Sequence, residues 1–368
     1  MGNVIPLWRE ISPTVRGLFV ITDPGRDQDD EDTLVLMNRY IRMELLNTLG
    51  VVANLQPSRM RARLAKGTLK ELGQDEIPVG WGSGQKQKDD DGLAYEFDVS
   101  YLADASETLN GEQLIYDTLC QAPEKGVVLV LISQLTDAAN AFRNNPDLFK
   151  RKVRRVVIMG GVVADGNHKV ALDELGRIIP DPTAQNHKFD LEATEFLYNA
   201  LQMNNIGITV VSRYAAGGAK VPRSMYDDMA ATGHSVGIRV YEAQKKAIEL
   251  LWQRTHMELD DPNRHGLPER CGPDWFSNVF LGGNGKDRNG SDSIWDLLQT
   301  FQLYDPMTLI AAIPTLRNYF YDSYVVEVMG VEHHVIGISA DRHGVSRPEE
   351  LSEYLASSLV ESLMMTLE

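Results

Sequence analysis

The stretch LFVITDPGRDQDDED, residues 18–32, decides the fold because it joins a buried strand to an acidic turn and a helix. Its first four residues form a continuous apolar run, which indicates a strand buried on both faces. The run ends at Asp23, and apolar residues at helical spacing follow over residues 31–45. A buried strand that leads through a turn into a helix is typical of a parallel α/β arrangement.

The same order of strand, turn and helix repeats toward the C-terminus. The sequence predicts further strands at 47–53, 77–80, 127–132, 156–159 and 206–211, and helices at 60–72, 223–230 and 236–253. Continuous Val, Ile and Leu in these strands indicate a parallel sheet that helices cover on both faces. We therefore predict an α/β fold with a Rossmann-like, open, mainly parallel sheet. In such a sheet the functional site lies beyond the carboxyl ends of the strands.

Two segments depart from this repeat. Residues 255–297 are rich in Pro, Gly, Asp and Asn, which predicts an irregular lid or insertion. Residues 323–340 hold two apolar runs at period-2 spacing, which predicts an antiparallel hairpin with its turn at 330–334, where two histidines face solvent. Residues 348–367 are expected to form a closing helix. No domain boundary is visible, so we predict that residues 1–368 form one domain.

The composition excludes several classes of protein. The 368 residues include 36 basic and 52 acidic side chains, which gives a formal net charge of −16. This charge argues against a protein that coats nucleic acid or binds a membrane surface, because phosphate binding needs a basic face. No run approaches the ~18 apolar residues of a membrane span, and no signal peptide is visible. We therefore expect a cytoplasmic protein whose partner is a small molecule.

The turn after the first strand concentrates acidic residues, since six of the ten residues from Asp23 to Asp32 are Asp or Glu. Carboxylates a few ångströms apart repel one another, so one of them must be protonated or neutralised by a cation. A ligand set made of oxygen atoms alone favours a hard metal, Ca²⁺ or Mg²⁺. The alternative is that acids in the first turn stabilise the helix dipole, a role that suits Glu31 and Asp32.

Several motifs resemble, in order, those of the inosine-uridine-preferring nucleoside hydrolases. Thr22-Asp23-Pro24-Gly25 followed by Asp29-Asp30 resembles the family's opening Asp-Pro-Gly-x-Asp-Asp, with two more residues in the turn. The other matching segments are Val51-Val52-Ala53-Asn54, Ser133-Gln134-Leu135-Thr136-Asp137, Met159-Gly160-Gly161, Asn186 to Asp190 with Glu192-Ala193, and Tyr304-Asp305-Pro306. They span about residues 17–340, so the chain resembles a divergent member of the family.

The resemblance implies Ca²⁺-dependent cleavage of the N-glycosidic bond of a nucleoside by a metal-bound water, which yields base and ribose. In this interpretation Asp23 is the catalytic base, and the metal ligands are Asp23, Asp30, Asp305 and the carbonyl of Thr136. The substrate contacts are Asp29, Asn54, Met159 and Asn186. Because the turn is longer here, Asp27 competes with Asp29 for the second acidic position. The resemblance also implies a homodimer or homotetramer.

Two positions depart from the family pattern and leave the substrate open. Tyr304 stands where many members have a histidine that is proposed to help the base leave, and a phenol with a pKa of about 10 is a poor proton shuttle. Ala184 stands at the position of an acidic residue, which Asp181 could replace in part. The candidate leaving-group contacts are Tyr304, Trp275 and His265. The alternative functions are hydrolysis of another ribosyl glycoside and catalytically silent binding of Ca²⁺ and sugar.

Overall fold

A nine-stranded sheet organises the part of the chain that the computed structural model describes, namely residues 15–84, 94–264, 267, 269–285 and 288–367. The strands, in sheet order, are β10 (Tyr324–Val328), β11 (Val331–Ile336), β7 (Gly207–Ser212), β6 (Val153–Gly160), β5 (Val127–Leu131), β1 (Val15–Thr22), β2 (Leu46–Ala53), β3 (Val79–Trp81) and β4 (Leu109–Asn110). All neighbours are parallel except β10 and β11. The predicted open, mainly parallel α/β sheet is confirmed.

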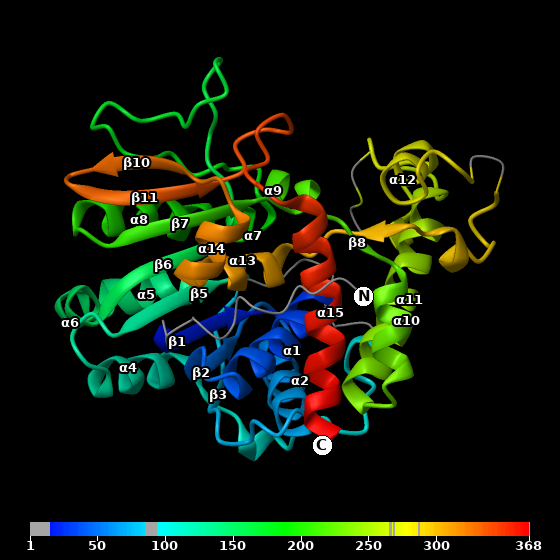
Figure 1. The fold of residues 1–368 in the computed structure, drawn as a ribbon, viewed down its shortest axis with the longest axis horizontal. Coiled ribbons are helices and arrows are strands. Elements are labelled where there is room, and N and C mark those ends of the chain that lie inside the picture. The colour runs from blue at the N-terminus through cyan, green and yellow to red at the C-terminus, as the bar shows by residue number, and fades with distance from the viewer. Residues whose placement is uncertain (1–14, 85–93, 265–266, 268, 286–287, 368) are drawn as a thin grey trace.

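Helices cover both faces of the sheet (Figure 1). One face carries α1 (Asp29–Arg42), α2 (Ser58–Glu71), α13 (Tyr304–Ala312) and α15 (Pro348–Leu367). The other carries α4 (Gly111–Gln121), α5 (Thr136–Asn144), α6 (Pro146–Lys152) and α8 (Leu191–Met203). Successive side chains of β1 show the division, because Val20 packs with the first group and Ile21 with the second. Burial on both faces explains why this strand is an uninterrupted apolar run.

Other elements complete the described part of the fold. The remaining helices are α3 (Ala94–Phe97), α7 (Gln185–Lys188), α9 (Arg213–Gly218), α10 (Ser224–Ala231), α11 (Ser235–Thr255), α12 (Pro273–Phe280) and α14 (Pro314–Phe320). Single 3₁₀ turns lie at Ala105–Glu107, Pro262–Arg264 and Trp295–Leu297, and a second sheet pairs β8 (Val221–Pro222) with β9 (Thr300–Phe301). No helix within the described ranges is both long enough and apolar enough to cross a membrane.

The predicted hairpin is present, but its turn lies earlier than expected. Met329 and Gly330 form the two-residue turn with φ angles of 52° and 79°, which is the left-handed geometry of a tight hairpin. His333 therefore lies inside β11, fully buried, and its Nδ1 accepts the backbone N–H of Ile208 at 3.1 Å. The expectation that this histidine faces solvent is wrong. Met329 occupies the first position of the turn, and methionine is not a typical turn residue, so the sequence predicted the turn too late in the chain.

The segment 255–297 is more regular than predicted, since it contains α12 and two 3₁₀ turns. Phe276 of α12 is fully buried and packs on Trp252 of α11, with the ring centroids 5.0 Å apart. Figure 1 shows α12 beyond the end of α11, at the periphery of the molecule. The segment is thus anchored on α11, while a role as a lid and the single-domain organisation stay predictions.

Candidate active site

The candidate site forms where β1 ends and two helices begin. β1 ends at Thr22, α1 begins at Asp29, and α13 begins at Tyr304. The first turns of the two helices bring together three carboxyl groups, of Asp29, Asp30 and Asp305, each with an oxygen within 4.8 Å of the others. This acidic triad lies beyond the carboxyl end of a central strand, as the topology predicts. Its donor set, oxygen only, fits a hard divalent cation.

Hydrogen bonds fix the triad in place. The hydroxyl of Thr22 donates to Asp30 Oδ1, and the backbone N–H of Asp23 donates to the same oxygen at 2.8 Å. The backbone N–H of Tyr304 donates to Asp29 Oδ2 at 3.2 Å, which ties the start of α13 to the start of α1. The carboxyl groups of Asp29 and Asp30 are therefore held by the end of β1 and the start of α13.

Burial makes the triad costly to ionise without a counter-ion. It raises the pKa of Asp29 to about 7, and the nearby charge of Asp27 adds to this effect. Burial also raises the pKa of Asp30 and of Asp305 well above the ordinary range, and the neighbouring carboxylates raise both further. A bound divalent cation would favour the charged form of all three groups.

Asp23 lies beside the triad without belonging to it. Its side chain is half-buried, and its charge raises the pKa values of Asp29, Asp30 and Asp305. Nη1 of Arg61, from α2, donates to the carbonyl oxygen of Asp23 at 2.6 Å and to that of Pro24 at 3.0 Å. These two bonds tie the turn to α2. The roles of Asp23 as base and as metal ligand stay predictions.

The other acids of the first turn of α1 are buried rather than solvated. Glu31 is fully buried and pairs with Arg239 of α11 at 3.4 Å. Asp32 is also fully buried and accepts a hydrogen bond from the hydroxyl of Tyr226 at 3.1 Å. These two residues do lie at the helix N-terminus, and each also connects α1 to a neighbouring helix.

Asn54 directly follows β2 and Thr136 is the first residue of α5, and both side chains bond to protein groups. Asn54 is fully buried, and its Nδ2 donates to the Gln134 carbonyl at 3.1 Å and to Asp137 Oδ2 at 2.8 Å. The hydroxyl of Thr136 donates to Asp190 Oδ2 at 2.7 Å. A ribose contact from Asn54 would require the exchange of one of these bonds, and both assigned roles stay predictions.

Asn186 and Met159 contact each other at the end of β6. Nδ2 of Asn186, from α7, donates to the carbonyl oxygen of Met159 at 3.2 Å. His187, the next residue, is fully buried, and its Nδ1 lies 2.7 Å from the carbonyl oxygen of Asp181. The buried imidazole anchors α7, and Asn186 is left half-buried at the carboxyl edge of the sheet.

The three candidate leaving-group residues differ in where they lie. The hydroxyl of Tyr304 donates to Gln302 Oε1 at 2.6 Å, and burial, with the charge of Asp29, raises the pKa of this phenol to about 12. Tyr304 therefore stays protonated at neutral pH and acts as a hydrogen-bond donor. Trp275 packs on Phe280 in α12, with ring centroids 5.8 Å apart. His265 lies outside the described residues.

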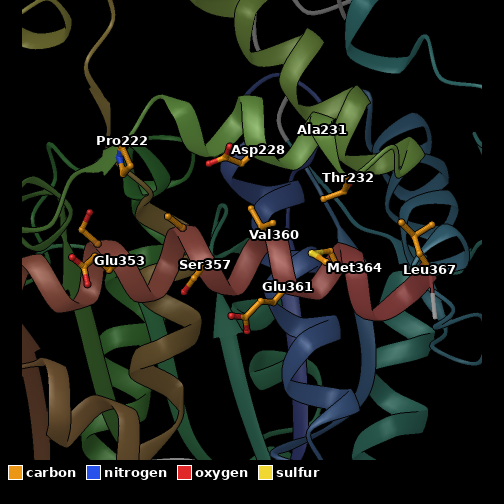
Figure 2. Close-up of a pocket in the computed structure, with 12 residues that line it drawn as sticks. Pro222, Asp228, Ala231, Thr232, Glu353, Ser357, Val360, Glu361, Met364 and Leu367 are labelled. Atoms are coloured by element: carbon orange, nitrogen blue, oxygen red, sulfur yellow. The ribbon is translucent and has the colours of Figure 1, made fainter. Parts of the chain in front are cut away.

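A separate groove on the surface does not contain the triad. Figure 2 shows it between α10 and α15, where Pro222, Val360 and Met364 line it together with polar side chains. The triad side chains come instead from α1 and α13. The candidate site is therefore the acidic triad, and this groove is not part of it.

The family profile of the inosine-uridine preferring nucleoside hydrolases matches residues 18–352 of the chain. The chain belongs to this family. No curated protein matches it. Among solved structures, the type III effector protein XopQ, complexed with adenosine diphosphate ribose, is 25% identical, with a TM-score of 0.82 over 97% of both chains. The effector protein XOO4466 is 25% identical, with a TM-score of 0.80 over 97% of this chain and 96% of that one.

The likeness extends to a nucleoside hydrolase of more distant sequence. The purine-preferring ribonucleoside hydrolase from Gardnerella vaginalis is 14% identical, with a TM-score of 0.58 over 95% of this chain and 99% of that one, which shows the shared fold. In this nucleoside hydrolase family member, the acidic triad is consistent with the Ca²⁺ site of the family.

Sequence reasoning missed two arginines near the site of this family member. Arg61 is almost fully buried in α2, and only its contact with the turn at Asp23 reveals its position. Arg213 is the first residue of α9 and directly follows the last residue of β7. A charged residue at the carboxyl end of a predicted strand was the signal that could have identified Arg213.

Proposed function

We propose that the chain is a Ca²⁺-dependent N-ribohydrolase that cleaves the N-glycosidic bond of a nucleoside. The observation that supports it most strongly is the acidic triad at the end of β1 in a member of the nucleoside hydrolase family. Ca²⁺ takes 6–8 oxygen ligands, so three carboxylates leave room for the sugar hydroxyls and water. When bound, the cation supplies positive charge that acidifies a coordinated water and orients the sugar.

Residues of the chain would supply the general base, the sugar contacts and a leaving-group contact. Asp23 lies beside the triad and would take a proton from the attacking water as general base. Asp29 would orient a ribose hydroxyl and Asn186 would support the sugar from the end of β6, which lowers the entropic cost of reaction. Tyr304 would donate a hydrogen bond toward the departing side of the substrate, because its phenol stays protonated at neutral pH.

A second candidate is a ribosyl compound larger than a nucleoside, either cleaved or only bound. It is favoured by the complex of XopQ with adenosine diphosphate ribose, since that protein is similar to this chain over 97% of its length. The tyrosine at position 304 also favours it, because a phenol with a pKa of about 12 activates a departing base poorly.

The direct test is a ribose-release assay over purine and pyrimidine ribonucleosides with Ca²⁺ present. We expect release from at least one nucleoside, loss of release after treatment with a chelator, and recovery when Ca²⁺ is returned. The Asp23→Asn variant should lower kcat by roughly 10²–10⁴-fold, the usual contribution of a general base. Full activity in this variant or in the chelated protein would contradict the mechanism. Ca²⁺ binding without release of any base would favour the second candidate.

A further inference from the structure

Arg213 is an exposed cation at the same edge of the sheet as the acidic triad. It follows Ser212, the last residue of β7, and 49% of its side chain is exposed. β6 and β5 separate β7 from β1, so the two strand ends are three strand spacings apart, about 14 Å. The guanidinium therefore lies on the rim of the proposed site rather than at its centre.

Tyr304 connects this rim to the triad. Its backbone N–H donates to Asp29 Oδ2 at 3.2 Å. Burial raises the pKa of its phenol, and the positive charge of Arg213 acts on the same group in the opposite direction. Tyr304 is thus close enough to the triad and to Arg213 for the charges of Asp29 and Arg213 both to act on its phenol. A ligand seated at the triad and extending past Tyr304 would reach the guanidinium.

Arg213 contacts three side chains of the protein, and its guanidinium also lies 5.2 Å from the centre of the Tyr214 ring. Nη1 donates to Thr183 Oγ1 at 3.2 Å, and Nη2 lies 3.5 Å from the Tyr214 hydroxyl and 3.7 Å from Asp181 Oδ2. An exposed ion pair of this length contributes little to stability. A guanidinium has five N–H donors, so these contacts orient Arg213 and leave donors for a ligand.

We propose that Arg213 forms an anion subsite that binds a phosphate group of a ribosyl ligand whose sugar lies at the acidic triad. This inference rests on the proposed function, because it takes the sugar to be held by Asp29 and by the cation bound at the triad. A guanidinium recognises phosphate through paired N–H donors. The protein carries a net charge of −16, so a cation at the rim is needed to offset repulsion of an anionic ligand. A plain nucleoside offers no group for this residue.

Calorimetric binding with Ca²⁺ present tests the subsite, with ADP-ribose and adenosine as probes. The Arg213→Gln variant should weaken ADP-ribose binding by about 10- to 100-fold, the range for loss of a charged hydrogen bond, and leave adenosine binding unchanged. The Asp181→Asn variant should bind ADP-ribose as tightly as wild type or more tightly, because it keeps the oxygen that accepts from Thr183 and removes a nearby negative charge.

Arg143→Gln is the matched control. Arg143 is also partly exposed, pairs with Glu192 at 3.2 Å and lies over the ring of Phe196 at 4.2 Å. It lies seven residues after Thr136 along α5, which places it about 10 Å from that start of the helix and away from the carboxyl edge. Its loss should change neither affinity.

Each remaining outcome decides the inference. An unchanged ADP-ribose affinity in Arg213→Gln, or an equal loss for both probes, would overturn the anion subsite. A wild-type protein that binds adenosine but not ADP-ribose would overturn the subsite and keep the proposed function. A wild-type protein that binds neither probe with Ca²⁺ present would overturn the proposed function and the subsite with it.

Discussion

At the scale of the residue, the acidic triad combines neighbours in sequence with a distant partner. The density of acids from Asp23 to Asp32 predicts a cation near the first strand. That prediction rests only on the repulsion between carboxylates that are close in sequence. The convergence of Asp305 on Asp29 and Asp30 could not be worked out from local patterns, because about 275 positions separate them, and it depended on the family resemblance. The hydrogen bonds of Asn54 could not be predicted from local patterns either, because its partners Gln134 and Asp137 follow a different strand, β5.

The Asp305→Asn variant tests the contribution of one triad residue. We expect Ca²⁺ affinity to fall by at least about tenfold, because mutation of a residue that only hydrogen-bonds to a metal ligand already lowers metal affinity by about that factor. Calorimetric titration with Ca²⁺ measures it. Asp32→Asn is the matched control, since Asp32 is an equally buried acid of α1 that contacts Tyr226 instead of the triad. Similar Ca²⁺ affinity in wild type and Asp305→Asn would rule out Asp305 as a ligand.

At the scale of the element, burial decides what the sequence can predict. The central strands are buried on both faces, so their apolar runs predict them to within a few residues. β4 has two residues, both exposed, and β8 has two residues, so neither is long enough to show a period. The long segment after α11 was predicted to be irregular because its Pro and Gly obscure the helical spacing of α12.

The anchoring of α12 on α11 gives a prediction at this scale. Phe276→Ala should lower the free energy of unfolding by about 3–5 kcal/mol, because it leaves a cavity against Trp252. Denaturant unfolding measures the loss, and Ca²⁺ affinity should stay that of wild type. Trp275→Ala is the comparison, since Trp275 is only partly buried and should destabilise less. A raised KM in Trp275→Ala would instead assign that ring to the leaving group.

At the scale of the whole molecule, the excess of acid has two different origins. Most of it lies on the surface and maintains solubility. The triad instead carries raised pKa values, with Asp30 and Asp305 buried and Asp29 half-buried. A folded-state pKa above the unfolded value means that the folded protein holds more protons, so stability falls as pH rises through the folded pKa. For Asp29 that decline runs from about pH 4, the ordinary pKa of the group, up to its folded-state pKa of about 7, above which the carboxyl is ionised in both states.

Thermal unfolding against pH tests this linkage. With chelator present, Asp29 should lower Tm as pH rises from about 4 to 7, whereas His333 and His334, whose pKa values are lowered to about 4, raise it up to the ordinary histidine pKa of about 6.5. The test is therefore the difference between the curves with and without Ca²⁺. With Ca²⁺ present the decrease should be smaller or reversed, because the cation binds the ionised carboxylates and stabilises the folded state. Parallel curves with and without Ca²⁺ would argue against a cation at the triad.

The central claim is that Asp29, Asp30 and Asp305 together hold a divalent cation, and a crystal structure of the protein grown with Ca²⁺ tests it most directly. We expect one ion bonded to an oxygen of each of the three carboxylates at about 2.3–2.6 Å, with other positions left for sugar hydroxyls and water. A well-ordered structure in which the three side chains turn apart, or in which Ca²⁺ occupies another place and leaves the triad without an ion, would contradict the claim.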